Sequence, residues 1–491
     1  MKSFKIKYPL LFVCIFTIYA CDRTPGDRIS ESDSLPAIEP DYTGITIPEN
    51  IAPLNFIIKE KGSAFYTEIF DGSKDVIKIK SNSGLIKIPR RKWKNLLQTD
   101  EFKDITVDVY VKNKVEGWKR FRSITNHISP DPVDPYITYR LIYPGYESWN
   151  ELSICQRSLG NFSEWNIIKN SAAEENCINC HSYNNGKTDD FLFHMRGSLA
   201  GTYFYSGQEF KKVNLKTKEM KNGAVYPRWH PSGKFVAFSS NKIIQQFHSL
   251  DNQKIEVSDL ESSLVLYDIT KNEMLPVIFP DMEKYMDTYP EWSPDGNNIF
   301  FCRAIQIADT FDYNLIRYNL MRASFNRDKR TFGIPEMIFD AASMNKSISF
   351  PRISPDGRYV VVTLHDYGCF PIWHKEADLW SIDMETKMAK PLALNSDFTD
   401  SYHSWSSNGR WMVFSSRRDD GLATRLYLSY MYTDCTSGKP FILPVKNPAF
   451  YERFMKSYNI PEFSEIKVKP VPGKIRKISR SGAIQTGWDS D

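Results

Sequence analysis

The chain lacks an excess of charge of either sign. It has 63 Lys and Arg residues against 59 Asp and Glu residues, and without Lys2, Lys5 and Lys7 the balance is 60 against 59. A chain so close to neutral has no basic field to attract nucleic acid, so no nucleic-acid partner is expected. It also lacks a G-x-S-x-G elbow, and too few residues follow its last strand pattern for a hydrolase domain, which excludes a peptidase of that type.

The apolar run at the N-terminus is too short to span a membrane. It covers residues 9–19, after the three lysines, whereas a membrane helix needs about 20 apolar residues. The following I-Y-A-C at 18–21 resembles a bacterial lipobox, which implies that residues 1–20 are a lipoprotein signal peptide and that Cys21 carries lipid. An ordinary secretory signal cleaved after Ala20 is the alternative. Lipidation would tether the body to a membrane.

One C-x-x-C-H sequence is present, at Cys177, Cys180 and His181, and the chain contains no second C-x-x-C and no H-x-x-x-H. This spacing is typical of c-type haem attachment, where two thiols bond to the porphyrin and the imidazole binds iron. A zinc site would need a second ligand pair, and a dithiol redox pair would need a βαβ context. These two readings remain as alternatives to one covalent haem c with His181 on its iron.

A second iron ligand is expected in F-L-F-H-M-R at 191–196. His194 and Met195 are both competent ligands, but neighbours in a strand point to opposite faces, so only one can reach the iron. His194 lies on the more polar face and is preferred, with Met195 as the alternative and an open position or another residue as the third. Arg196 is expected to pair with a haem propionate.

Differences in composition divide the N-terminal third of the chain into segments. Residues 21–45 are rich in Asp, Ser, Glu, Pro and Gly, which predicts a flexible stalk. Residues 46–130 alternate short apolar segments with turn formers, which predicts a small β-sandwich-like domain with one short helix over 91–98. Three prolines within 129–135 predict an extended linker to the next domain.

Beyond the linker the chain repeats. The copies read Y-P-R-W-H-P-S-G at 226–233, Y-P-E-W-S-P-D-G at 289–296, F-P-R-I-S-P-D-G at 350–357 and Y-H-S-W-S-S-N-G at 402–409. Each predicts a strand, a tight turn and an apolar strand, and another strand pattern follows each copy. Two weaker units, at 137–154 and 202–217, precede them. Three or four strands per unit is the content of a propeller blade.

These copies resemble the WD-like β-propeller repeat of TolB-like proteins. The resemblance implies an all-β fold with a six-bladed propeller over residues 137–440. The position of the C-x-x-C-H sequence between the two weaker units predicts that it lies in an insertion at 171–190 between two early blades. Together with the lipobox and the haem motif, the chain resembles a group of Bacteroidetes-type lipoproteins. Residues 443–491 are expected as a C-terminal extension, with a helix over 450–458 and a solvated basic tail.

Four cysteines remain after the signal, lipid and haem positions are assigned. Cys302 lies in an apolar stretch and is expected as a buried thiol, and no disulfide is predicted for this group. His365 and His374 flank an aromatic-rich insertion at 366–373, which is expected either as a contact surface or as a packed connection. The unassigned cysteines are Cys155, Cys302, Cys369 and Cys435.

These features predict a lipid-anchored cell-envelope protein, in the outer membrane and facing the periplasm or the cell surface. Its haem would serve electron transfer to a redox or envelope partner, with the propeller as docking scaffold. The alternative is a TolB-like scaffold for a protein or glycan, in which haem is structural or absent. An electron carrier or binding protein is favoured over an enzyme, because haem catalysis such as peroxide chemistry requires an open position on the iron.

Overall fold

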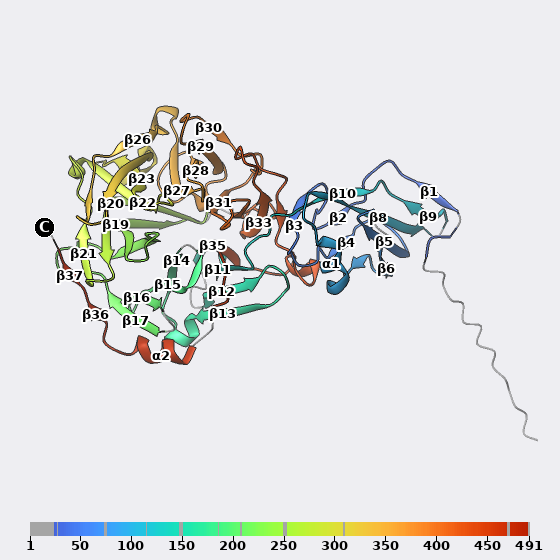
Figure 1. Cartoon of the computed structure of the whole chain (residues 1–491), viewed down its shortest axis with the longest axis horizontal. Helices are drawn as coiled ribbons and strands as arrows, with labels where there is room; N and C mark the ends of the chain where they lie inside the picture. The colour runs from blue at the N-terminus through green and yellow to red at the C-terminus, as the bar shows by residue number, and fades with distance from the viewer. Residues whose placement is uncertain are drawn as a thin grey trace, which may run out of the picture.

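The chain forms an N-terminal β-domain and a larger β-propeller, which lie end to end (Figure 1). The predicted signal peptide over 1–20 and Cys21, the predicted lipidation site, lie outside the described residues. No helix in the described part of the chain is long and apolar enough to cross a membrane. The structure is a computed structural model that describes residues 24–26, 28–72, 76–113, 115–146, 151–184, 186–206, 209–248, 253–307, 310–468 and 472–489.

The N-terminal domain consists of two sheets and one helix. A three-stranded sheet holds β2 (Ile38–Glu39), β4 (Phe56–Ile58) and β7 (Leu85–Ile86). The helix predicted over 91–98 is present as α1 (Arg90–Leu97). The seven-stranded sheet contains β1 (Ile29–Glu31), β3 (Thr46–Pro48), β5 (Ala64–Phe70), β6 (Ile77–Ser81), β8 (Lys103–Asn113), β9 (Gly117–Arg120) and β10 (Ile124–Ser129).

Residues 28–45 belong to this domain, which corrects the expectation of a flexible stalk there. Strand β1 pairs in parallel with β9, and β2 pairs antiparallel with β4. Tyr42 and Ile45 are buried in the core that the N-terminal domain shares with the propeller. The segment has little apolar content overall, but its few apolar side chains are the ones that reach the core.

The propeller consists of six sheets, and in each the neighbouring strands of the chain pair antiparallel. Counted along the chain, the first sheet holds β11 (Tyr136–Ile142), β12 (Ser153–Ser158), β13 (Glu164–Lys169) and β35 (Ser457–Ser464). The second holds β14 (Ile178–Asn184), β15 (Lys187–Met195), β16 (Gly201–Ser206), β17 (Glu209–Asn214) and β36 (Ile484–Gln485). The third holds β18 (Ala224–Trp229), β19 (Phe235–Phe247), β20 (Ile255–Asp268), β21 (Glu273–Pro276) and β37 (Gly487–Trp488).

The last three sheets contain the clearest sequence repeats. The fourth holds β22 (Tyr285–Trp292), β23 (Asn298–Ile305), β24 (Asn319–Asn326), β25 (Thr331–Phe332) and β26 (Glu336–Phe339). The fifth holds β27 (Ser347–Ile353), β28 (Tyr359–His365), β29 (Asp378–Asp383) and β30 (Ala389–Pro391). The sixth holds β31 (Asp400–Trp405), β32 (Trp411–Ser416), β33 (Arg425–Tyr430) and β34 (Phe441–Ile442).

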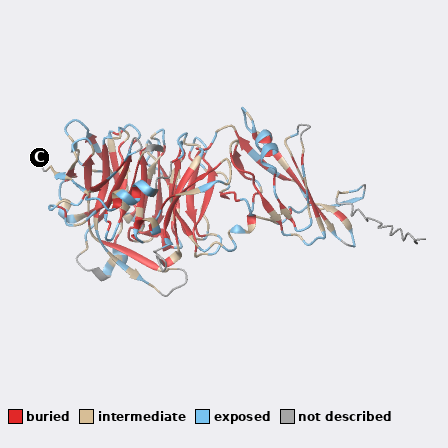
Figure 2. Ribbon diagram, turned by 90° about the horizontal axis from the view of Figure 1, so that it is seen from below, coloured by how far each residue is buried: buried red, intermediate tan, exposed pale blue. Residues whose placement is uncertain are grey.

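The apolar strands of each sheet are buried against the neighbouring sheets, so the core consists of layers between sheets (Figure 2). Strand β28 is buried along its whole length, as a strand covered on both faces must be. This strand order confirms the predicted all-β propeller.

The C-terminal region closes the propeller, which corrects the prediction of a separate extension. Strand β35 pairs antiparallel with β11, so both ends of the propeller sequence meet in the first sheet. The predicted helix over 450–458 is absent: Pro448–Phe450 forms one 3-10 turn and a strand begins at Ser457. I-P-E-F at 460–463 is a shortened copy of the repeat, which explains why the segment is a strand.

The segment beyond β35 is attached to the propeller, while its described basic side chains are exposed to solvent as predicted. Helix α2 (Pro472–Ser479) packs beside β17, and Lys212 donates a hydrogen bond of 3.0 Å to the carbonyl oxygen of Ser479. Strands β36 and β37 then add in parallel to the outer edges of the second and third sheets.

Replacing Tyr458 with alanine should destabilise the closed propeller. Tyr458 lies in β35, is fully buried and packs edge-on against Tyr139 of β11 with ring centroids 4.9 Å apart. Loss of a buried aromatic ring should lower the free energy of unfolding in urea by about 3–5 kcal/mol. Tyr432→Ala, at an exposed ring, is the control and should change it by less than about 0.5 kcal/mol. Equal effects of the two substitutions would contradict the role of β35.

Candidate functional site

The C-x-x-C-H sequence lies in the innermost strand of the second sheet, not in an insertion between blades as predicted. Cys180 and His181 are part of β14, and Cys177 immediately precedes it. Residues Asn170–Ala173 form a 3-10 turn without a side-chain cap, and Glu174 ends it in the left-handed conformation.

Cys180 occupies the position of the first residue of the repeat. In every inner strand this residue has a left-handed backbone, with φ of 51° at Cys180 and 53° at Tyr226. The ladder to the next strand skips this residue and its successor, as in a β-bulge. C-H-S-Y at 180–183 is therefore a sixth copy of Y-P-x-W. The other residues at this position are Tyr289, Phe350, Tyr402 and Ile460.

These six side chains line the axis of the propeller and nearly fill it. The ring centroids of Tyr226 and Tyr289 lie 4.5 Å apart, and those of Phe350 and Tyr402 lie 4.7 Å apart. The remaining cavity between them, which Cys180 lines, has a volume of about 50 Å³. The axis is thus an apolar plug with one thiol in its wall.

One end of this plug is covered by the fifth sheet. The Tyr289 hydroxyl donates a hydrogen bond of 2.9 Å to the carbonyl oxygen of Cys369, and Ser349 donates one of 2.7 Å to the same atom. Cys369, Phe370 and Trp373 are all buried. The insertion at 366–373 is therefore a packed connection, and the alternative of an exposed contact surface is wrong.

The other end opens into a funnel with a volume of about 450 Å³. Its floor carries an alternating chain of charges from four inner strands. Arg228 Nη1 lies 2.7 Å from Glu462 Oε1, and its Nε lies 3.2 Å from Glu291 Oε2. Arg352 Nη1 lies 3.1 Å from the same Glu291 oxygen. Burial outweighs the charge of Arg228 and raises the pKa of Glu291 to about 7.

His181, the last residue of the C-x-x-C-H sequence, lies next to the floor of this funnel. Its side chain is almost fully buried, and neither ring nitrogen has a hydrogen-bond partner among the described residues. The nearest acidic atom is Glu462 Oε2, 3.9 Å from Nε2, which also lacks a hydrogen bond. Burial lowers the pKa of His181 to about 4 against the opposing charge of Glu462 and a polar contact with the Ile460 backbone, so the imidazole is neutral at pH 7.

The residues expected near the iron lie on β15, beside the pentapeptide. Met195 is registered with Ile178 and lies in the core between the first and second sheets, where Cys177 also packs. His194 is registered with Asn179 on the opposite face, and its Nδ1 lies 3.1 Å from the Thr202 hydroxyl. The two side chains point to opposite faces as predicted, and Met195 shares the face of Cys177.

Arg196 is exposed at the end of this strand, and its backbone N–H donates a hydrogen bond of 2.9 Å to the carbonyl oxygen of Cys177.

The donor set of this site suits a haem, but the space does not. Cys177 and Cys180 are free thiols, and His181 offers a neutral, uncommitted imidazole. The cavity next to Cys180 and His181 is about 50 Å³, whereas ligand and cofactor pockets measure ~300–1,000 Å³. In this arrangement of strands a porphyrin does not fit beside the three residues.

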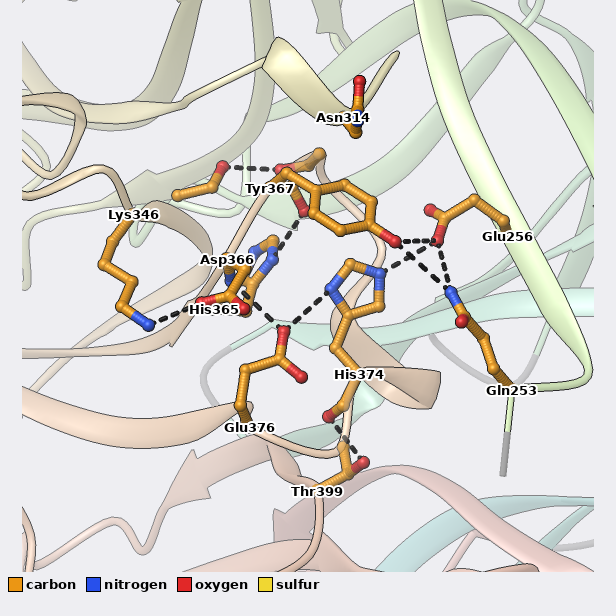
Figure 3. A network of polar contacts seen from close by, with 12 residues as sticks. Gln253, Glu256, Asn314, Lys346, His365, Asp366, Tyr367, His374, Glu376 and Thr399 are labelled. Atoms are coloured by element: carbon orange, nitrogen blue, oxygen red, sulfur yellow. Dashed lines mark hydrogen bonds and ion pairs between the residues drawn. The ribbon is translucent and has the colours of Figure 1, made fainter. Parts of the chain in front are cut away.

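A second polar cluster joins the third and fifth sheets (Figure 3). His374 Nε2 lies 3.0 Å from Glu256 Oε2 of β20, and its Nδ1 lies 3.5 Å from Glu376. The Tyr367 ring stands 4.6 Å from His374, and the His365 ring 5.4 Å. Burial alone would lower the pKa of His374, but the two glutamates raise it to about 9.

The described residues contain no group of three His, Cys, Asp or Glu side chains arranged to hold a metal ion. The cluster around His374 is therefore a buried ion-pair network that joins two sheets. The six described cysteines are all free, and Cys302 is buried as predicted. The four cysteines without an assigned role are thus thiols in the core.

Comparison with known proteins adds similarity at the level of the fold only. No family profile and no curated protein matches the chain. Among solved structures, TolB from Acinetobacter baumannii is 12% identical over 77% of this chain and 85% of its own, with a TM-score of 0.43. The β-propeller domain of Myceliophteria thermophila Cps50 (Swd1) is 13% identical over 54% of this chain and 86% of its own, with a TM-score of 0.30.

The titration of His374 tests the buried network. Its folded pKa of about 9 lies above the unfolded value of about 6.5, so the network stabilises the fold fully below about pH 6.5 and loses this contribution as the pH rises through about 9. NMR of selectively labelled histidines should show this midpoint. Glu256→Gln should lower it by about one unit or more, whereas the exposed Glu385→Gln should not. A wild-type midpoint below about 6.5 would contradict the network.

Proposed function

We propose that this protein is a cell-envelope scaffold, lipid-anchored at Cys21, whose propeller binds a protein partner at the axial funnel. Each of the six sheets is one blade. The funnel carries the proposal, because it combines a volume of about 450 Å³ with polar groups that converge from four inner strands. Concave sites of ~300–1,000 Å³ with a few placed polar groups are the usual form of a binding site.

The charges of the funnel floor favour a polar partner segment. Arg228 and Arg352 alternate with Glu462 and Glu291 in ion pairs, so the floor presents charges of both signs to a polypeptide. Arginine suits such recognition because its planar guanidinium donates several hydrogen bonds. The plug beneath the floor stops a ligand from passing through the axis, so a partner would bind at the face and not thread the propeller.

Cross-linking from the funnel wall tests this proposal. A photo-reactive amino acid at Ser404, which lines the funnel, should give a partner adduct in the native host, and one at the exposed Lys329 should not. Arg352→Gln removes a charged hydrogen-bond donor and should reduce the adduct about ten-fold. The control Arg358→Gln, at an exposed arginine outside the funnel, should leave it unchanged. Identical adducts from both positions would reject the funnel as the binding site.

Covalent haem at Cys177 and Cys180 is a second proposal, supported by the uncommitted nitrogens of buried His181. The cysteines would hold the group and His181 would face its iron, which would supply one-electron chemistry to a redox partner. Because the cavity is small, attachment requires the start of β14 to move away from the axis. Met195, on the face of Cys177, is then a better placed second ligand than His194.

Expression with a cytochrome c maturation system tests the haem. Attachment should add the mass of one haem to the peptide that contains residues 177–181. Cys177→Ala with Cys180→Ala should remove the added mass, and Cys155→Ala should retain it. Carbon monoxide should bind after Met195→Ala but not after His194→Ala if Met195 is the second ligand. A colourless protein without added mass would reject the haem and leave the scaffold proposal standing.

A further inference from the structure

A second large depression lies on the fourth sheet, away from the axis. This groove has a volume of about 580 Å³, which exceeds that of the funnel. It runs past the ends of β23 and β24 and along β26, and most of its lining is apolar. Its principal apolar side chains are Ile305, Ile307, Leu315, Met321, Ile334 and Met337.

The rim of the groove exposes large apolar side chains to an unusual degree. Ile334 is 81% exposed, Ile305 70%, Leu315 62% and Met337 50%. Single exposed apolar residues are ordinary on a protein surface, but several around one depression indicate a binding site. The groove is therefore a candidate site for an apolar ligand.

The wall of this groove contains the positively charged side chain of Arg317. Arg317 Nη1 donates hydrogen bonds of 2.6 Å and 3.0 Å to the carbonyl oxygens of Asn314 and Ile316. Its Nη2 donates one of 3.0 Å to Asn345 Oδ1. Its Nε is buried and has no hydrogen-bond partner among the described residues. The guanidinium is thus held in place by neutral oxygens, and burial lowers the pKa of Arg317 from its usual value.

No described carboxylate neutralises this arginine through an ion pair. Asp366 acts on it only at longer range, and that carboxylate lies 2.5 Å from the ammonium of Lys346. Nη1 already donates both of its protons and Nε is buried, so Nη2 keeps one N–H for a ligand, and a hydrogen bond from a charged group to a carboxylate is a strong one. The charge of the groove therefore favours a ligand with one carboxylate.

Three other polar side chains of the lining already have partners. Arg303 makes two hydrogen bonds, of 2.7 Å and 2.8 Å, to Asp287. Asp281 pairs with Lys284 at 2.9 Å, and Asn319 accepts a hydrogen bond from the backbone N–H of Ala342.

This pairing argues against a peptide ligand. A peptide would bring an N–H and a C=O group with every residue into this apolar groove, where few free partners remain for them. A methylene chain brings none.

We propose that the groove binds an aliphatic monocarboxylate, with the chain along the apolar wall and the carboxylate on Arg317. The groove places an uncompensated guanidinium at the side of an otherwise apolar depression, which is the arrangement that an acyl chain with a single charged end requires. This site is independent of the axial funnel and of the haem motif.

Calorimetric titration of the full chain with dodecanoate, at monomeric concentrations, tests the proposal. Wild type should bind one dodecanoate per chain. Arg317→Gln should weaken binding about ten-fold, because a charged hydrogen bond is lost. The control Arg322→Gln, whose guanidinium pairs with Glu336 at 2.5 Å, should leave it unchanged. Dodecanol lacks the carboxylate, so its affinity for wild type should not exceed the affinity of dodecanoate for Arg317→Gln.

A second variant separates chain binding from loss of fold. Ile334→Asp changes an exposed residue, so its unfolding midpoint in urea should equal that of wild type while dodecanoate binding is lost. Absence of wild-type binding, or equal binding by wild type and Arg317→Gln, overturns the proposal. Two further results would overturn it. One is a dimer that Ile334→Asp disrupts while no dodecanoate binds, and the other is tighter binding of an amidated apolar peptide than of dodecanoate.

Discussion

The narrow axis of the propeller is the constraint on which the rest of the structure depends. Six inner strands converge there, and each places one side chain on the axis from a residue with a left-handed backbone. Such a backbone costs about 1–2 kcal/mol for a residue other than glycine. The contacts of the ring offset this cost, with Tyr289 lying 4.5 Å from Tyr226 and 4.6 Å from Phe350 between ring centroids. The bulges at these residues also direct Arg228, Glu291 and Arg352 into the funnel, so plug and funnel have one origin.

Because of this constraint, the C-x-x-C-H sequence is a copy of the propeller repeat as well as a candidate haem-attachment sequence. Cys180 fills the place that an aromatic residue takes in four other sheets, and His181 fills the place of the following proline or histidine. His403 at the same place in the sixth sheet lies 2.8 Å from the carbonyl oxygen of Val361, whereas His181 has no hydrogen bond. The propeller repeat therefore explains where His181 lies, but not why its ring nitrogens lack hydrogen-bond partners among the described residues. A buried polar group without a partner is uncommon and points to an additional ligand or to water.

Much of the fold could be predicted from the sequence, because the Pro-Asp-Gly type turn marks four repeats in register. The fifth and sixth copies, at 460–463 and 180–183, were missed because they retain the bulge and an aromatic fourth residue, Phe463 or Tyr183, but neither the aromatic first residue nor the turn. The opposite faces of His194 and Met195 followed from strand geometry alone. The funnel could not be predicted, because its charges meet only in space: Arg228 and Glu462 are 234 residues apart in the chain. The groove on the fourth sheet depends in the same way on side chains from several strands and loops.

The pairing of β35 with β11 has a consequence for the biogenesis of the protein (Figure 1). The ribosome delivers the chain from its N-terminus, so the fourth, fifth and sixth sheets are complete before the strand that closes the ring exists, and each of the first three lacks only its C-terminal strand. Until Ser464 emerges, β11 remains an open edge, and open edges pair readily with other chains. The segment over 457–464 therefore decides whether the edge of β11 is covered. A chain shortened by a few dozen residues would keep nearly all of its repeats, but its β11 edge would stay open to pairing with other chains and to proteases.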